Sequence, residues 1–158
     1  MGGRVHNIFV SHTGKDASAI EELKTLLTKA GRSVRDSSIT KETKPNEATN
    51  EQYIKSEIIA PAIRWAGTLI VLISPDTKAS DFVDWEIEYA SQHEKRIVGV
   101  WLRGSNDCDI PDKLDEFADA VVGWNTDKIL AAIDGDLNNW ECADGSAKPD
   151  RPIRVYNC

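Results

Sequence analysis

The chain has 158 residues, which corresponds to one domain at about 150 residues per domain. Its 19 basic and 26 acidic side chains give a formal net charge of −7. This balance argues against a dedicated nucleic-acid binder and against a protein held on anionic lipid, because both need a basic surface. The cysteines form no CxxC pair and the histidines are scattered, so neither a disulfide scaffold nor a metal site is predicted. No apolar segment is typical of a signal peptide or long enough to span a bilayer, and we expect a cytoplasmic protein.

Apolar runs separated by polar segments predict five strands. The runs at 68–73 and 97–102 are almost continuously aliphatic or β-branched, which is typical of strands covered on both faces of a parallel sheet. The other runs lie at 7–11, at 33–35 and at 118–124, and the last two give weaker signals.

The apolar spacing between these runs is helical. The predicted helices cover 17–30, with Gly31 after the last turn, then 54–63, with a kink or a second helix at Pro61, then 83–90 and 129–133. Strands that alternate with helices predict an α/β fold. We expect a flavodoxin-like, doubly wound, mostly parallel sheet of five strands with helices on both faces.

Two segments carry no periodic pattern. Residues 36–51 are polar and predict one long loop, a kind of segment that is usually functional or mobile. Beyond about residue 135 the sequence is rich in Asp, Asn, Gly, Lys and Pro. We therefore expect a domain at 1–135 and a C-terminal extension at 136–158, either packed on the domain or disordered.

Short polar side chains follow the predicted strands. Open parallel sheets bind ligands outside the carboxyl ends of their strands, near the point where the strand order reverses. Ser11 and His12 end the first strand, Asp36 and Ser37 follow the second, and Ser80 precedes the helix after the third. These residues predict a polar pocket for a small molecule. No GxGxxG, P-loop or GxSxG motif accompanies them.

Glu86 stands out within the helix predicted at 83–90. Helical spacing places Phe82 and Val83 one turn before it and Tyr89 and Ala90 one turn after it, so its side chain projects from the apolar side. A carboxylate among apolar groups is costly unless it has a partner or a function. A capping or ion-paired glutamate near a helix start is the alternative interpretation. Glu88, on another side of the helix, should face water.

Five segments in order resemble a TIR-like domain, specifically the TIR-like family that includes the Thoeris antiphage protein ThsB. The first segment, 6–12, contains a hydrophobic strand that ends in Ser, and the second, 33–38, contains a strand followed by Asp. The third, 80–87, is similar to a Ser-x-Trp-x-x-x-Glu signature. The last two segments are 96–102, a strand, and 110–114, which contains Pro and Leu. The resemblance covers about residues 6–133. Phe82 stands where the signature often has Trp.

The resemblance implies an enzyme that cleaves NAD⁺ in bacterial antiphage defence. TIR enzymes release nicotinamide and pass the ADP-ribosyl group to water or back onto the same molecule, which gives ADP-ribose or a cyclic ADP-ribose-type signal. The matched glutamate is Glu86, which would be the catalytic residue. Ser11 and Asp36 match positions near the substrate, and Phe82 and Trp85 would form an aromatic wall. NAD⁺ is then the substrate, and no metal or further cofactor is expected.

The resemblance also implies partners. We expect self-association through TIR surfaces and a separate effector protein reached by the diffusible nucleotide product. We expect neither a nucleic acid nor a membrane as partner. A non-catalytic TIR-like module that only binds other proteins is the alternative, because a fold does not dictate a function.

Overall fold

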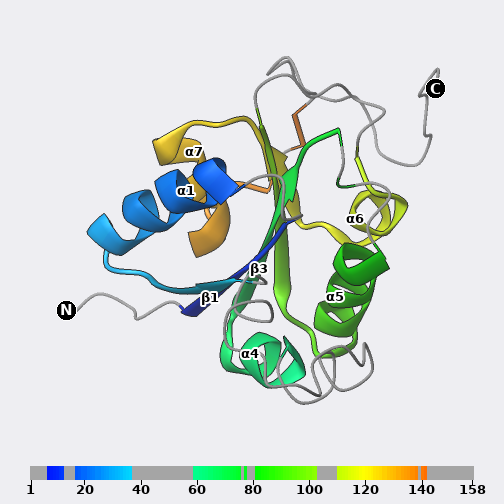
Figure 1. Cartoon of the computed structure of the whole chain (residues 1–158). Coiled ribbons are helices and arrows are strands. Elements are labelled where there is room, and N and C mark those ends of the chain that lie inside the picture. Colours follow the sequence, from blue (N-terminus) through cyan, green and yellow to red (C-terminus); the bar gives the residue numbers. More distant parts are fainter. Residues whose placement is uncertain are drawn as a thin grey trace.

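A parallel sheet of five strands forms the centre of the computed structural model (Figure 1). The structure describes residues 7–12, 17–36, 59–75, 77, 81–102, 110–138 and 140–141. In spatial order the strands are β2 (Ser33–Asp36), β1 (Asn7–Ser11), β3 (Thr68–Ile73), β4 (Arg96–Trp101) and β5 (Ala120–Val122). Every neighbouring pair is parallel. The predicted flavodoxin-like, doubly wound fold is confirmed, with its reversal of strand order between β1 and β3.

Helices cover both faces of this sheet (Figure 1). On one face lie α1 (Ala17–Lys29) and α7 (Thr126–Asp134), and on the other α4 (Ala60–Trp65), α5 (Asp81–Gln92) and α6 (Asp112–Phe117). Helix α4 begins at Ala60 and has Pro61 in its first turn, where a missing N–H breaks no helical bond. Residues 54–58 of that predicted stripe lie outside the described residues.

Helix α6 is a correction to the sequence prediction, which placed no helix there. It has 6 residues, too few for an apolar stripe to repeat. Its place depends on a contact distant in sequence. A Cβ built on Gly99 of β4 would lie 2.9 Å from Leu114 Cδ2 and 3.2 Å from Ile73 Cδ1. The bare glycine therefore leaves the room in which Leu114 anchors α6 to the sheet.

Alternation along the strands divides the core into two layers. Ile8 and Val10 of β1 face α1 and α7, whereas Phe9 faces α5. Ser11, two residues after Phe9, points to the same side as Phe9 because side chains alternate along a strand. All six side chains of β3 are buried. Leu69, Val71 and Ile73 face one layer of the core, and Ile70, Leu72 and, by alternation, Thr68 face the other. Burial on both faces explains why this run shows no polar alternation.

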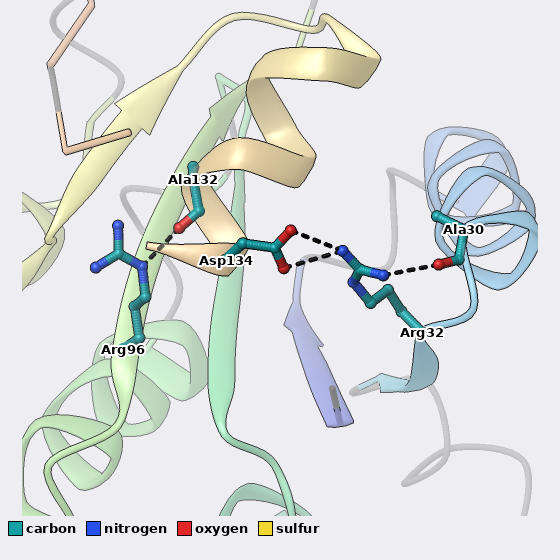
Figure 2. A network of polar contacts seen from close by, with 5 residues as sticks. All are labelled: Ala30, Arg32, Arg96, Ala132 and Asp134. Carbon is teal, nitrogen blue, oxygen red and sulfur yellow. Dashed lines mark hydrogen bonds and ion pairs between the residues drawn. The ribbon is translucent and has the colours of Figure 1, made fainter. Parts of the chain in front are cut away.

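Two arginines fasten α7 to the amino edge of the sheet, where the strands begin (Figure 2). Arg32, just before β2, donates from Nη2 to both carboxylate oxygens of Asp134 at 2.9 Å. Arg96, the first residue of β4, donates from Nε to the Ala132 carbonyl at 2.5 Å and from Nη2 to the Leu137 carbonyl at 3.0 Å. Positive charge at the C-terminus of a helix also complements its dipole. We call Arg32, Arg96 and Asp134 the α7 clamp.

The chain after α7 returns to the sheet at β5. Trp140 makes an isolated parallel bridge with Val121, and the Glu141 carbonyl accepts a bond of 2.9 Å from Trp101 Nε1. Glu141 Oε1 accepts another bond of 2.9 Å from the backbone N–H of Gly123. Residues 142–158 of the predicted extension lie outside the described residues. Within the described part of the chain, no helix combines the length and the apolar character that a membrane span requires.

Candidate functional site

Ser11 and Glu86 meet at the carboxyl edge of the sheet, where the strand order reverses. The Ser11 hydroxyl donates to Glu86 Oε1 at 2.5 Å, and both residues are fully buried. Ser11 is the last residue of β1, and its register partner in β3 is Val71. The contact therefore joins two positions 75 residues apart in sequence at the place where open α/β sheets bind ligands.

Helix α5 presents Glu86 to this edge through its apolar face. Val83 and Ile87, one turn before and one residue after, are fully buried in the same core layer as Phe9 and Val71. The predicted projection of Glu86 from the apolar side is thus what the structure has. Glu88 is 41% exposed and lies 3.4 Å from Lys113 Nζ, as expected for a surface carboxylate.

A compact hydroxyl cluster follows β3. Thr77 Oγ1 donates to the Leu72 carbonyl at 2.9 Å and accepts from the Ser74 backbone N–H at 2.9 Å. The Ser74 and Thr77 hydroxyl oxygens lie 3.0 Å apart, and the Thr77 N–H donates to the Ser74 carbonyl at 3.1 Å. We call this arrangement the Thr77 knot. Sequence reasoning missed Thr77, since a Ser-x-x-Thr spacing after a strand is the one available signal and is common in turns.

Buried polar side chains are concentrated around this edge. Among the described residues, the buried polar or charged side chains outside it are Thr68, at the start of β3, and Asp115, in α6. The others lie at the carboxyl ends of β1 and β3 or on the adjoining helix, and they are Ser11, His12, Ser74, Thr77 and Glu86. Burying polar groups costs free energy, so such a concentration marks a candidate functional site.

Of the remaining predicted site residues, some lie at or near the carboxyl edge and others lie outside the described part of the chain. His12 is buried directly after Ser11. Asp36 ends β2 with its backbone beside Val10, next to the site, whereas its side chain lies outside the described part. Trp85 is half-buried and stacks on Tyr89, one turn further along α5, at 5.0 Å between ring centroids. Ser37, Ser80 and the side chain of Phe82 lie outside the described residues.

A surface hollow of about 690 Å³ lies elsewhere, between α1 and α7. Leu26, Trp124 and Leu130 form its apolar wall, and exposed Glu21 and Glu22 form part of its rim. These residues belong to the opposite face of the sheet from Glu86. We place the candidate site at the carboxyl edge rather than in this hollow, because the buried carboxylate is at that edge.

Metal ligands do not gather in the described part of the chain. No group of three or more His, Cys, Asp or Glu side chains lies close enough there to hold an ion. The chemistry on offer from the described residues is therefore that of one buried carboxylate with a hydroxyl donor beside it.

Solved structures with this fold include enzymes and a receptor domain. A 2-deoxyribosyltransferase from the psychrotolerant bacterium Bacillus psychrosaccharolyticus matches 91% of this chain and 98% of its own at 14% identity, with a TM-score of 0.60. The TIR domain of the Toll-related receptor TRR-2 from Hydra magnipapillata matches 83% of this chain and 94% of its own at 18% identity, with a TM-score of 0.56. The Clostridium botulinum CMP N-glycosidase BcmB matches 80% of this chain and 98% of its own at 16% identity, with a TM-score of 0.50. At these identities the likeness establishes the fold.

Sequence comparison is more specific. A search of curated proteins found no match to the chain. The model of the family described as "Thoeris protein ThsB, TIR-like domain" matches residues 9–107, which include both Ser11 and Glu86 and more than half of the chain. The chain therefore belongs to the TIR-like domain family of the Thoeris protein ThsB.

Proposed function

We propose that this protein cleaves NAD⁺ at the bond between nicotinamide and ribose, with Glu86 as the catalytic residue. The observation that carries the proposal is the full burial of Glu86 against the Ser11 hydroxyl at the ligand-binding edge of the sheet. Family membership supports a TIR-type role in bacterial antiphage defence. Asp36, at the end of the neighbouring strand, and His12 lie in positions suited to contact the nucleotide.

The reaction asks little of the protein beyond one well-placed negative charge. As the C1′–N1 bond breaks, its electron pair goes to the pyridinium nitrogen, and nicotinamide leaves as a neutral base. Positive charge grows on the ribose, giving an oxocarbenium-like transition state. A carboxylate fixed beside the ribose stabilises that charge and orients the ribose hydroxyls without transferring a proton. Water is then captured at C1′ and loses a proton to give ADP-ribose, or an atom of the same nucleotide is captured to give a cyclic product.

Two of the structural neighbours support chemistry at glycosidic bonds. By their names, one is a 2-deoxyribosyltransferase described as a suitable biocatalyst for the synthesis of nucleosides, and the other is an N-glycosidase of CMP. NAD⁺ cleavage breaks the same type of bond, between a ribosyl carbon and a ring nitrogen. The carboxyl edge of this fold is thus a reasonable place for ribosyl transfer in the present chain.

The wider role would follow from the product. We propose that a cyclic ADP-ribose-type nucleotide diffuses to a separate effector protein, and that copies of this chain self-associate through TIR surfaces during activity. No cofactor is needed in this scheme besides NAD⁺ as the substrate.

Incubation with NAD⁺ tests the proposal, with nicotinamide release followed by chromatography and the nucleotide product identified by mass spectrometry. Glu86→Gln removes the charge but keeps an oxygen that accepts the Ser11 bond, so the turnover rate should fall by at least about 10²-fold while the melting temperature changes little. Glu88→Gln is the matched control on the same helix, because Glu88 is 41% exposed and pairs with Lys113. Its rate should equal that of the wild type.

Two outcomes would contradict the proposal. If the wild-type chain releases no nicotinamide, also at high protein concentration and in extracts of phage-infected cells, the alternative of a non-catalytic interaction module is favoured. If Glu86→Gln unfolds the protein at ordinary temperature, Glu86 is a structural residue.

A further inference from the structure

We infer that Thr77 is a positioning residue for Glu86, an inference that rests on the function proposed above. Thr77 does not touch Glu86 in any described contact. It is fully buried, and its hydroxyl ties the segment that leads from β3 to α5 back onto the end of β3. This knot would fix where α5 begins along the sheet, and it would thereby fix the distance between the Glu86 carboxylate and the Ser11 hydroxyl.

The bonding of the Thr77 hydroxyl shows why a hydroxyl is needed. One oxygen donates to the Leu72 carbonyl and accepts from the Ser74 N–H, both at 2.9 Å, and it lies 3.0 Å from the Ser74 hydroxyl. Valine has the same shape but leaves the Leu72 carbonyl and the Ser74 N–H without this partner. Serine keeps the oxygen and loses only a methyl group. The pair Thr77→Val and Thr77→Ser therefore separates the hydrogen bonds from the packing.

The path from the knot to Glu86 is short. Leu72 follows Val71, the residue in register with Ser11 across the β1–β3 pair. The knot thus bonds Thr77 to the strand position that follows the register partner of Ser11. In sequence, only three residues, 78–80, separate Thr77 from the start of α5 at Asp81. Glu86 follows within the second turn of that helix.

Packing alone would fix α5 less sharply. Val83 and Ile87 hold the helix against the sheet through apolar contacts, which are not directional and tolerate small slides along the axis. Hydrogen bonds lose strength steeply with distance and angle, so the knot fixes Thr77 against the end of β3, and a slide of α5 would have to be absorbed between Thr77 and Asp81. This matters because a misplacement of about 1 Å in a catalytic group lowers a rate by about 10²-fold.

The kinetic test compares Thr77→Val, Thr77→Ser and wild type in nicotinamide release at a temperature at which all are folded. We expect Thr77→Val to lower kcat by about 10-fold to 10²-fold with KM within about twofold, because Glu86 is misplaced while the substrate contacts remain. Thr77→Ser should keep most of the wild-type kcat. Equal kcat for Thr77→Val and wild type would overturn the inference, and so would an equal loss in the two variants.

A second measurement does not depend on activity. Backbone amide exchange should accelerate at Val83–Ile87 in Thr77→Val while amides of α1 at Ile20–Leu27 exchange as in wild type. An exchange pattern unchanged in α5, or raised equally in both helices, would overturn the positioning role. If the wild type releases no nicotinamide, the proposed function fails, yet this comparison still decides whether Thr77 positions α5.

Ser74→Ala covers the case in which Thr77→Val does not fold. It removes the contact between the two hydroxyls and leaves the backbone bonds of the knot in place. The expected changes have the same direction and are smaller, about threefold in kcat for one neutral hydrogen bond. Wild-type kcat and wild-type α5 exchange in Ser74→Ala would then count against the inference.

Discussion

The two edges of the sheet handle buried charge in opposite ways. At the amino edge, the α7 clamp pairs opposite charges, and Arg32 and Asp134 form a two-fold contact at 2.9 Å. At the carboxyl edge, Glu86 is more deeply buried than either of them, and its described donor is the neutral hydroxyl of Ser11. The clamp is arranged as a device for stability, whereas the carboxylate is held in place by a weaker donor.

The difference matters for function because a cation-paired carboxylate is already stabilised. An arginine beside Glu86 would partly neutralise the carboxylate and would compete with a developing positive charge on a substrate, whereas the Ser11 hydroxyl is a neutral donor. The Ser11 hydroxyl orients the carboxylate and adds no positive charge beside it. The comparison predicts that changes at the carboxyl edge lower activity more than stability, and that changes at the amino edge do the reverse.

Ser11→Ala should have the largest effect among the variants that test this contrast. Loss of a hydrogen bond to a charged group corresponds to about 1.5–3 kcal/mol, or about 10-fold to 10²-fold in rate if the bond is needed in the transition state. Because the structure uses the Ser11 hydroxyl on Glu86, we expect the loss in kcat. Steady-state nicotinamide release over a range of NAD⁺ concentrations measures it.

The same titration decides between two roles for Ser11. Family resemblance implies that Ser11 contacts the nucleotide, and a residue that binds substrate and transition state equally would raise KM with kcat unchanged. A rise in KM alone would therefore contradict the role of Ser11 as the residue that orients Glu86. A fall in kcat alone would support that role and leave nucleotide contacts to Asp36 and His12.

Arg96→Met should lower stability without lowering activity. The guanidinium donates to the Ala132 and Leu137 carbonyls and to Asn138 Oδ1, and methionine keeps the apolar stem while it removes all of these bonds. We expect the free energy of unfolding in urea to fall by about 1.5–3 kcal/mol, the range for bonds to a charged donor. Nicotinamide release at low temperature should match the wild type.

Lys113→Met is the control for the loss of a cation from this chain. Its partner Glu88 lies 3.4 Å away, and the two side chains are 39% and 41% exposed, so the solvent screens the pair. The free energy of unfolding should change by less than about 0.5 kcal/mol. Equal losses for Arg96→Met and Lys113→Met would mean that the α7 clamp contributes no more than a surface ion pair.

Local patterns were enough to predict most of the fold and the burial of Glu86. The strand runs at 68–73 and 97–102 are apolar on both faces, and their observed bounds are Thr68–Ile73 and Arg96–Trp101. Gly31 follows α1 with a φ of +84°, as its helix-ending position predicted. Helical spacing alone placed Glu86 on the apolar side of α5. These are short-range properties that a sequence displays directly.

Contacts that depend on strand register or on partners distant in sequence could not be predicted from the sequence. The donor to Glu86 lies 75 residues earlier in the chain, and only the pairing of β1 with β3 brings it close. Thr77 bonds to backbone groups of Leu72 and Ser74, and its Ser-x-x-Thr spacing is too common in turns to single it out. Helix α6 depends on the space above Gly99, and the clamp depends on where α7 ends.

Glu94→Gly should have a small effect of the opposite sign, because it removes strain from the amino edge. Helices α1 and α7 are followed by Gly31 and Gly135 at φ values of +84° and +87°, whereas the turn after α5 has Glu94 at +56°. A left-handed conformation costs a residue with a Cβ about 1–2 kcal/mol, and the greater chain entropy of unfolded glycine offsets part of that gain. We expect the free energy of unfolding in urea to rise by roughly 0.5–1 kcal/mol.

Glu22→Gly is the matched substitution, at an exposed position within α1. It should lower the free energy of unfolding by about 1 kcal/mol. A loss of stability in both variants would show that the Glu94 turn is not strained. Nicotinamide release should stay at the wild-type rate in either case, since Glu94 lies at the amino edge and α1, which carries Glu22, covers the opposite face of the sheet from Glu86.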